Sequence, residues 1–248
     1  MPPKAPTIPA PEVRRPVSPR TKFLAWLGIT GVAEFILALI ALHATSMTNQ
    51  PWHMSDFARS RYPWLWVAGA YSFAVAGIAL IFALQEHLPG SVPARAGLVL
   101  LWLSVFGMLL IATFPSDLTP QPQTVSGTIH NDAVWPTFSS VGVAMMVMGP
   151  ALHRRRSWRP FAAASVVLGL LVCASGIAYV LADTRGLILV AFAQRLLVAL
   201  IAIWFVLLGL NLLAIRPLRS REAPAATQPA LQAVNAPAPP QPAPDDHP

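Results

Sequence analysis

The sequence predicts an all-α fold, a polytopic integral membrane bundle of six transmembrane helices. The first observation is composition: 55% of the 248 residues are hydrophobic and only 11% are charged, whereas about a quarter of the residues in soluble domains are charged. The second is that the apolar residues form six long runs, and about 20 consecutive apolar residues suffice to cross a bilayer as a helix. The third is that these runs lack the alternation of a membrane β-barrel, so helices are the remaining way to satisfy the backbone in lipid.

The apolar runs give the predicted spans, and their flanks mark where some of them begin and end. The first run follows about twenty residues rich in Pro and Arg and exceeds the apolar part of a secretory signal, so we expect an uncleaved first helix. Pro115 ends the third run. The predicted membrane domain covers residues 22–215, with helices at residues 23–44, 64–84, 97–115, 133–152, 161–182 and 187–215.

The cations of the chain are distributed unevenly over the two sides of this bundle. Of 17 Lys and Arg residues, three lie on the side opposite the termini, namely Arg59, Arg61 and Arg185, and Arg195 lies within the sixth span. The remaining thirteen lie on the side of the termini: Lys4, Arg14, Arg15, Arg20, Lys22, Arg95, Arg154, Arg155, Arg156, Arg159, Arg216, Arg219 and Arg221. By the positive-inside rule, both termini are cytoplasmic. The net charge of +7 therefore indicates orientation, and we expect membrane lipids as partners and no nucleic acid.

Two proline-rich tails flank the predicted membrane domain, residues 1–21 and residues 216–248. Seven of the 26 prolines precede residue 20, and nine lie from Pro217 onward. Segments with so few large apolar residues cannot offset the entropy lost on folding. We expect both tails to be disordered and cytoplasmic.

Small residues follow one another at four-residue spacing along the fifth predicted helix. Ser165, Gly169 and Cys173 form this stripe, which suits close contact between helices. Packing within the bundle is the first interpretation, and the seam of a homo-oligomer is the second. Cys173 is the single cysteine, so a disulfide framework and a thiolate metal cluster are excluded.

The connection between the third and fourth spans holds the densest group of polar residues. Asp117 follows Pro115 at the outer end of the third span, and His130 and Asp132 precede the fourth span. Asp132 is placed to cap the fourth helix, where a carboxylate is stabilised by the helix dipole. Asp117 and His130 are the candidate catalytic pair, as acid and base. His130, Asp117 and Asp132 are weak candidates for a metal shell, because no helix supplies a second His at ligand spacing, and the sequence predicts no metal and no cofactor.

Two charged residues lie within predicted spans. Arg195 is either an anchor at the outer headgroup level or, if the sixth helix begins at Leu187, a deeper cation that needs Asp117 or Glu34 as its partner. Glu34 lies near the middle of the first span, where without a charged partner it would be protonated and hydrogen-bonded within the bundle. Ionisable groups within a membrane are candidates for function because they are costly to place there.

Four short motifs in this order resemble a family of bacterial and archaeal six-helix membrane proteins known as domain of unknown function 998. They are HMSDFARSRYPWLW before the second span, FPSD after the third, GTIH before the fourth and AFAQRLLV in the sixth. Ser116 stands where the family usually has Thr, and Ala191 where Gly is common. The resemblance covers residues 22–215 and implies a role for Ser55, Asp56, Asp117, His130, Gln194 and Arg195. It implies a multi-pass protein in the plasma membrane of a bacterial cell. It implies no reaction and gives no support to Glu34.

Three functions follow from these residues as hypotheses. The first is a structural or accessory protein in which Asp117, His130 and Arg195 form a polar network at the outer helix ends. The second is a membrane enzyme acting on a lipid or isoprenoid headgroup, with Asp117 and His130 as catalytic groups and Arg195, Gln194, Ser55 and Asp56 binding the headgroup. The third is transport of a small solute or proton through Glu34, which is disfavoured because no inverted repeat or broken helix is evident.

Overall fold

The computed structural model describes residues 17–45, 53–117, 124–187 and 189–214, all within one compact unit, Val17–Arg216. The described residues contain six long α-helices, two short 3-10 helices and no strand, which confirms the predicted all-α fold. Each long helix is long and apolar enough to cross a membrane. In chain order the elements are α1 (Pro19–Thr45), η1 (Met54–Arg59), α2 (Pro63–Gln85), α3 (Val92–Thr113), α4 (Val125–His153), η2 (Arg156–Trp158), α5 (Arg159–Thr184) and α6 (Leu189–Ala214).

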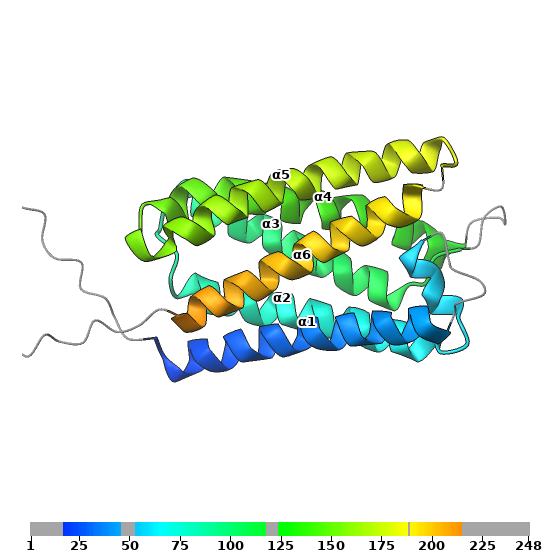
Figure 1. The fold of residues 1–248 in the computed structure, drawn as a ribbon, viewed down its shortest axis with the longest axis horizontal. Helices are drawn as coiled ribbons and strands as arrows, with labels where there is room; N and C mark the ends of the chain where they lie inside the picture. Colours follow the sequence, from blue (N-terminus) through cyan, green and yellow to red (C-terminus); the bar gives the residue numbers. More distant parts are fainter. Residues whose placement is uncertain (1–16, 46–52, 118–123, 188, 215–248) are drawn as a thin grey trace, which may run out of the picture. The chain divides into compact units, whose positions relative to one another are not determined.

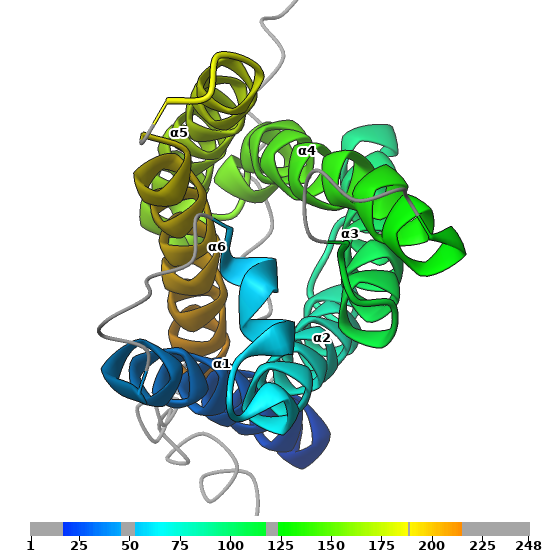
Figure 2. The same ribbon diagram turned by 90° about the vertical axis from the view of Figure 1, so that its right-hand side faces the viewer.

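The six long helices form a ring. Each packs against its neighbours in the chain, and α6 returns to contact α1 (Figure 1). η1 contacts α2 and α6, and Figure 2 shows it across the mouth of the ring. We call this the η1 end of the ring, and the opposite end, which holds η2, the η2 end. The polar motifs predicted from the sequence lie at the η1 end.

Apolar side chains cover both the inside and the outside of the ring. On the inside, the Phe73 ring stacks on Phe205 and packs at a tilt against Phe35, with ring centroids 5.1 and 4.7 Å apart. On the outside, large apolar side chains such as Phe23 and Phe192 are 66% exposed. Soluble monomers rarely expose such surfaces in bulk, and a helix that is apolar on all sides is typical of a membrane span.

Small residues allow the helices to pack closely. A Cβ atom added at Gly107 of α3 would lie 2.0 Å from the hydroxyl oxygen of Thr137 on α4. The predicted stripe of Ser165, Gly169 and Cys173 packs against α4 of the same chain, and a Cβ atom at Gly169 would lie 2.8 Å from the carbonyl oxygen of Gly142. Ser165 is fully buried, so this stripe serves packing inside one chain.

Helix boundaries differ from the prediction most at the starts of α4, α3 and α1, and α3 begins at Val92 instead of residue 97. α4 begins at Val125 instead of residue 133, because the Thr124 side chain caps the helix by accepting a hydrogen bond from the Gly127 amide at 3.1 Å. Asp132 was predicted to be that cap and instead lies two turns inside α4, on an exposed face. At the other end of the chain, α1 begins at Pro19, within the stretch predicted to be a disordered tail. The predictions for residues 1–16 and 215–248 lie outside the described residues.

Basic residues gather at the η2 end. Among the described residues outside the long helix interiors, the η1 end holds Arg59, Arg61 and Arg185. The η2 end holds Arg20, Lys22, Arg95, Arg154, Arg155, Arg156 and Arg159. This distribution supports a cytoplasmic η2 end, and the orientation itself stays a prediction.

Candidate functional site

Two hollows adjoin each other at the η1 end of the ring. One is a chamber of about 30 Å³ on the inside, and the other is a groove of about 590 Å³ on the outer face between α1 and α6. Phe35, Met54 and Val198 line both hollows. The chamber and the groove are therefore separated by a wall one side chain thick.

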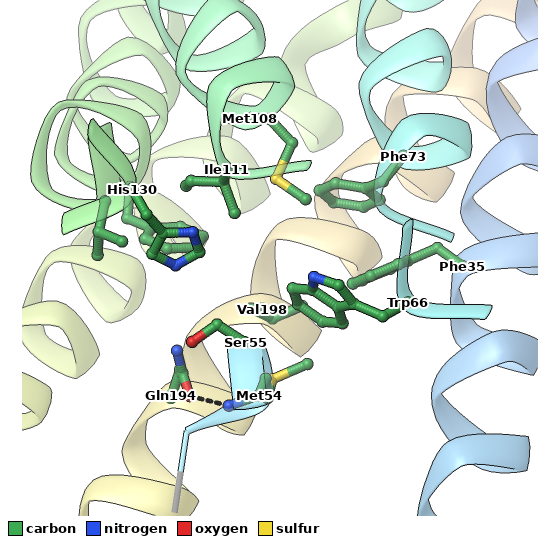
Figure 3. A pocket seen from close by; sticks show the side chains of 12 residues that line it. Phe35, Met54, Ser55, Trp66, Phe73, Met108, Ile111, His130, Gln194 and Val198 are labelled. Atoms are coloured by element: carbon green, nitrogen blue, oxygen red, sulfur yellow. Dashed lines mark hydrogen bonds between the residues drawn. The ribbon is translucent and has the colours of Figure 1, made fainter. Parts of the chain in front are cut away.

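Three polar side chains from three elements line the chamber. Ser55 comes from η1, His130 from α4 and Gln194 from α6, and each is more than nine-tenths buried. Figure 3 shows their polar atoms pointing toward one another among apolar side chains such as Ile111 and Trp66. The chamber is thus the place where three of the six residues implied by the resemblance converge.

Hydrogen bonds to backbone groups determine which atoms of His130 and Gln194 remain as donors and acceptors for the chamber. The Nδ1 atom of His130 lies 2.7 Å from the carbonyl oxygen of Phe114, and a carbonyl only accepts, so Nδ1 donates. In a neutral imidazole the Nε2 atom is then an acceptor. The Oε1 atom of Gln194 accepts a hydrogen bond from the Met54 amide at 2.6 Å, so the NH₂ group of Gln194 is left as a donor. The Ser55 hydroxyl has no hydrogen-bond partner among the residues that the structure describes.

The chamber has the size and the polar groups to bind one water molecule. A cavity holds a water molecule when the volume open to the centre of a water-sized sphere is at least about 10–15 Å³. A buried water makes about three hydrogen bonds. Here the three groups are a donor on Gln194, an acceptor on His130 and the Ser55 hydroxyl, which serves as either. An imidazole acceptor beside a hydroxyl and a water is also the basis of acid–base chemistry.

The groove is open toward lipid and almost entirely apolar. α1 and α6 touch toward the η2 end, where a Cβ atom at Gly209 would lie 2.7 Å from Ile29, and they diverge toward the η1 end (Figure 1). Ile40 and Ile203 line the groove and are 59% and 49% exposed. Its lining residues on α6 run from Arg195 to Leu207, about 18 Å along the helix axis.

Arg195 and His43 form the polar end of the groove. The Nε atom of Arg195 donates to Nε2 of His43 at 3.0 Å, and its Nη1 atom donates to the carbonyl oxygen of Ala191 at 2.8 Å. The Nδ1 atom of His43 lies 2.7 Å from the carbonyl oxygen of Leu39 and donates to it, so Nε2 is an acceptor and the ring is neutral. The pair therefore places the Arg195 guanidinium at the end of an apolar groove, where the Asp56 carboxylate also interacts with it electrostatically.

Asp117 does not take part in either hollow. Its carboxylate lies 3.6 Å from the guanidinium of Arg59 and accepts hydrogen bonds from the Thr124 amide and hydroxyl at 2.6 and 2.9 Å. It therefore joins η1 and the end of α3 to the start of α4. This corrects the predicted pairing of Asp117 with His130 or Arg195, because the early start of α4 carries His130 into the bundle and away from the loop.

The other predicted acids do not line either hollow, but the Asp56 carboxylate interacts electrostatically with both His130 and Arg195. Asp56 caps η1 by accepting a hydrogen bond from the His53 amide at 3.1 Å. Glu34 lies on the exposed outer face of α1, where the Ser72 hydroxyl donates to it at 2.8 Å. Among the described residues, no three His, Cys, Asp or Glu side chains are placed to share a metal ion, and His130, Asp117 and Asp132 do not converge.

The comparison with known families covers most of the helical region. A model for a family described as "Protein of unknown function (DUF998)" matches residues 29–211. The chain belongs to the DUF998 family. No curated protein and no solved structure matches the chain. It is thus a DUF998 protein with six helices that are long and apolar enough to make it a multi-pass membrane protein.

In this DUF998 protein the residues implied by the resemblance divide into three groups. Ser55, His130 and Gln194 line the chamber, and Arg195 lies at the end of the groove. Asp56 and Asp117 fix the local structure of η1 and of the start of α4. Sequence reasoning did not select His43, the partner of Arg195, because 152 residues separate the two and no local pattern links them.

Proposed function

We propose that this protein binds a membrane lipid with an anionic headgroup, in an accessory role. The acyl chain occupies the groove between α1 and α6, and the headgroup lies beside Arg195. The single observation that carries the proposal is the cation of Arg195 and His43 at the end of a groove that is otherwise apolar and faces lipid. In this role Arg195 binds the lipid headgroup, whereas Gln194 and Asp117 hold η1 in place. The polar residues therefore act in separate groups and not as one network.

The dimensions of the groove match one leaflet of a bilayer. α6 has 26 residues and a length of about 39 Å, so roughly 4–5 Å extends beyond each edge of a hydrocarbon core of about 30 Å. Arg195 is six residues from the start of α6, which places its backbone about 5 Å inside the core edge. A long Arg side chain spans that distance and reaches the headgroup level. The groove continues from there by about 18 Å, slightly more than half of the core.

The chemistry of Arg195 favours an anionic headgroup. A guanidinium stays charged and binds two oxygens of a phosphate or carboxylate at once. Electrostatic attraction is stronger beside apolar walls than in water. A zwitterionic or neutral lipid would gain less from the same position.

The test measures lipid that remains bound to the purified full-length protein, by native mass spectrometry. Charge-assisted hydrogen bonds contribute about 1.5–3 kcal/mol, and the partly exposed Arg195 belongs at the lower end, so Arg195→Ala should lower anionic lipid occupancy roughly ten-fold. Arg185→Ala, an exposed cation in the turn between α5 and α6, is the matched control and should change nothing. Unchanged occupancy in Arg195→Ala would refute the headgroup position.

A second variant tests the acyl-chain position separately. Ala199 is exposed and lines the groove, so Ala199→Trp fills the groove without disturbing buried packing. We expect this variant to lose lipids of every headgroup class. Retention of bound lipid at the wild-type level would place the chain elsewhere.

The chamber favours a second candidate function, hydrolysis of an ester bond in the bound lipid. The Nε2 atom of His130 takes a proton from the chamber water as the water oxygen bonds to the ester carbon, and the proton then passes to the departing alcohol oxygen. The wall of Phe35, Met54 and Val198 must open for this step. Incubation of the protein with an ester lipid should release free fatty acid, and His130→Phe should abolish the release while lipid binding remains. No release from the wild-type protein removes this candidate and leaves the binding proposal standing.

A further inference from the structure

A carboxyl group lies on the outer surface of the ring at mid-membrane depth. α1 has 27 residues and a length of about 40 Å, and Glu34 is two residues from its midpoint, about 3 Å along the axis. Its side chain is exposed on the outside of the bundle. The Ser72 hydroxyl on α2 donates to Oε2 at 2.8 Å, and the other carboxyl oxygen has no partner among the described residues.

Such a position is costly for a single chain in lipid. Ionisable residues within membrane spans nearly always face a bundle interior or a water-filled cavity, or pair with one another. A carboxyl group in hydrocarbon is neutral, and it then carries one hydrogen-bond donor and an acceptor that both need partners. One bond from Ser72 satisfies only part of this requirement.

The residues around Glu34 form a stripe along α1. Thr30, Glu34, Leu37 and Ala41 follow one another at spacings of four, three and four residues, the pattern of a seam between two packed helices. Leu37 is 65% exposed, and the small side chains of Thr30 and Ala41 allow close approach of a second helix. At 100° per residue this stripe lies on the side of α1 opposite the groove, so a protein packed against it leaves the groove open.

We propose that this stripe is the docking surface for a second copy of the chain, with the two Glu34 carboxyl groups hydrogen-bonded to each other across a twofold axis. Two copies inserted with the same orientation place their Glu34 residues at the same depth. A partner of another sequence would not in general carry a matching carboxyl group at that depth. A neutral carboxyl is also self-complementary, since each copy donates one hydrogen bond and accepts one. A twofold axis closes this contact and pairs the same surface of both copies.

The first test measures association of the full-length protein in liposomes by energy transfer between labelled copies as lipid dilutes them. Glu34→Leu should weaken dimerisation roughly ten-fold or more, as expected from two lost interhelical hydrogen bonds. Glu34→Gln, whose amide also donates and accepts, should dimerise like the wild-type protein. Thermal unfolding of each variant confirms that the fold is retained. A wild-type protein that stays monomeric, or a Glu34→Leu variant that associates normally, overturns the proposal.

The second test locates the contact. In a Cys173→Ser background, Leu37→Cys should form a disulfide-linked dimer on oxidation. Leu170→Cys, which is 57% exposed on α5, is the matched control and should not. Equal crosslinking at both positions would indicate random collision and would refute the α1 surface as the interface.

Discussion

The hydrogen bond between Gln194 and Met54 should control how η1 closes the ring. The Met54 amide donates to the Gln194 side chain at 2.6 Å, and both residues are buried. Gln194→Met keeps the size of the side chain and removes the acceptor. A buried amide left without a partner costs about 1–3 kcal/mol, which corresponds to a 5- to 150-fold larger population of open η1.

Hydrogen–deuterium exchange of the Met54–Arg59 segment measures this population directly. Exchange in Gln194→Met should accelerate by that factor within η1 and stay unchanged in the middle of α2 to α5, because the lost hydrogen bond holds only η1. The ion pair of Arg59 with Asp117 still anchors η1 in this variant. Asn211→Leu is the matched control. It removes a polar side chain of α6 about 26 Å further along the axis, where the structure gives the Asn211 amide nitrogen no hydrogen bond to lose.

The outcome separates two roles of Gln194. Acceleration confined to η1 means that Gln194 holds η1 over the chamber. If η1 exchanges at the wild-type rate in Gln194→Met, the bond does not hold the segment, and the reasoning from burial is wrong. Acceleration throughout the bundle in both variants would mean that polar groups of α6 support the fold in general.

Three further predictions address packing, charge and orientation. Gly107→Ala should destabilise the protein by about 1–3 kcal/mol in thermal unfolding because its methyl group collides with Thr137, whereas Gly176→Ala, whose new methyl group would lie 3.4 Å from its nearest neighbour, should be neutral or slightly stabilising. Hydrogen bonding, chiefly from Thr21, lowers the pKa of Glu86 below its ordinary value of 4.5, so the stability difference between wild type and Glu86→Gln should be present above pH 4.5 and shrink as the pH falls below it. With the Glu86 side chain 31% exposed, we expect only a few tenths of a kcal/mol. A C-terminal reporter that fluoresces only in the cytoplasm should be bright, and a dark fusion that is still expressed would reverse the predicted orientation.

Most of the fold could be predicted because the bilayer imposes it. The thickness of the hydrocarbon sets the length of each helix, so apolar runs located all six long helices. The start of α4 was misplaced by eight residues because the segment from Val125 to Asp132 is polar and its helix depends on a cap at Thr124. A hydropathy profile does not detect a helix cap, and here two polar turns at the start of α4 continue into an apolar span.

The site was only partly predictable because helix rotation is set by packing. The resemblance selected Ser55, His130 and Gln194, yet nothing in their spacing indicates that they meet in one chamber. For Arg195 the sequence left Asp117 and Glu34 open as partners, and the structure pairs it with His43. A contact across 152 residues depends on how α1 and α6 face each other, which no local pattern encodes.

The adjacent residues Gln194 and Arg195 connect the two hollows through a single turn of α6. Consecutive residues of an α-helix project about 100° apart, so one position faces the chamber while the next faces the groove. A small rotation of α6 would therefore move the amide that binds η1 and the cation at the groove together. A lipid that pulls on Arg195 acts on the same turn that holds Met54, and Met54 belongs to the wall between the hollows. The proposed lipid binding at Arg195 would therefore be coupled to the closure of the chamber through the neighbouring Gln194, because both side chains lie on one turn of α6.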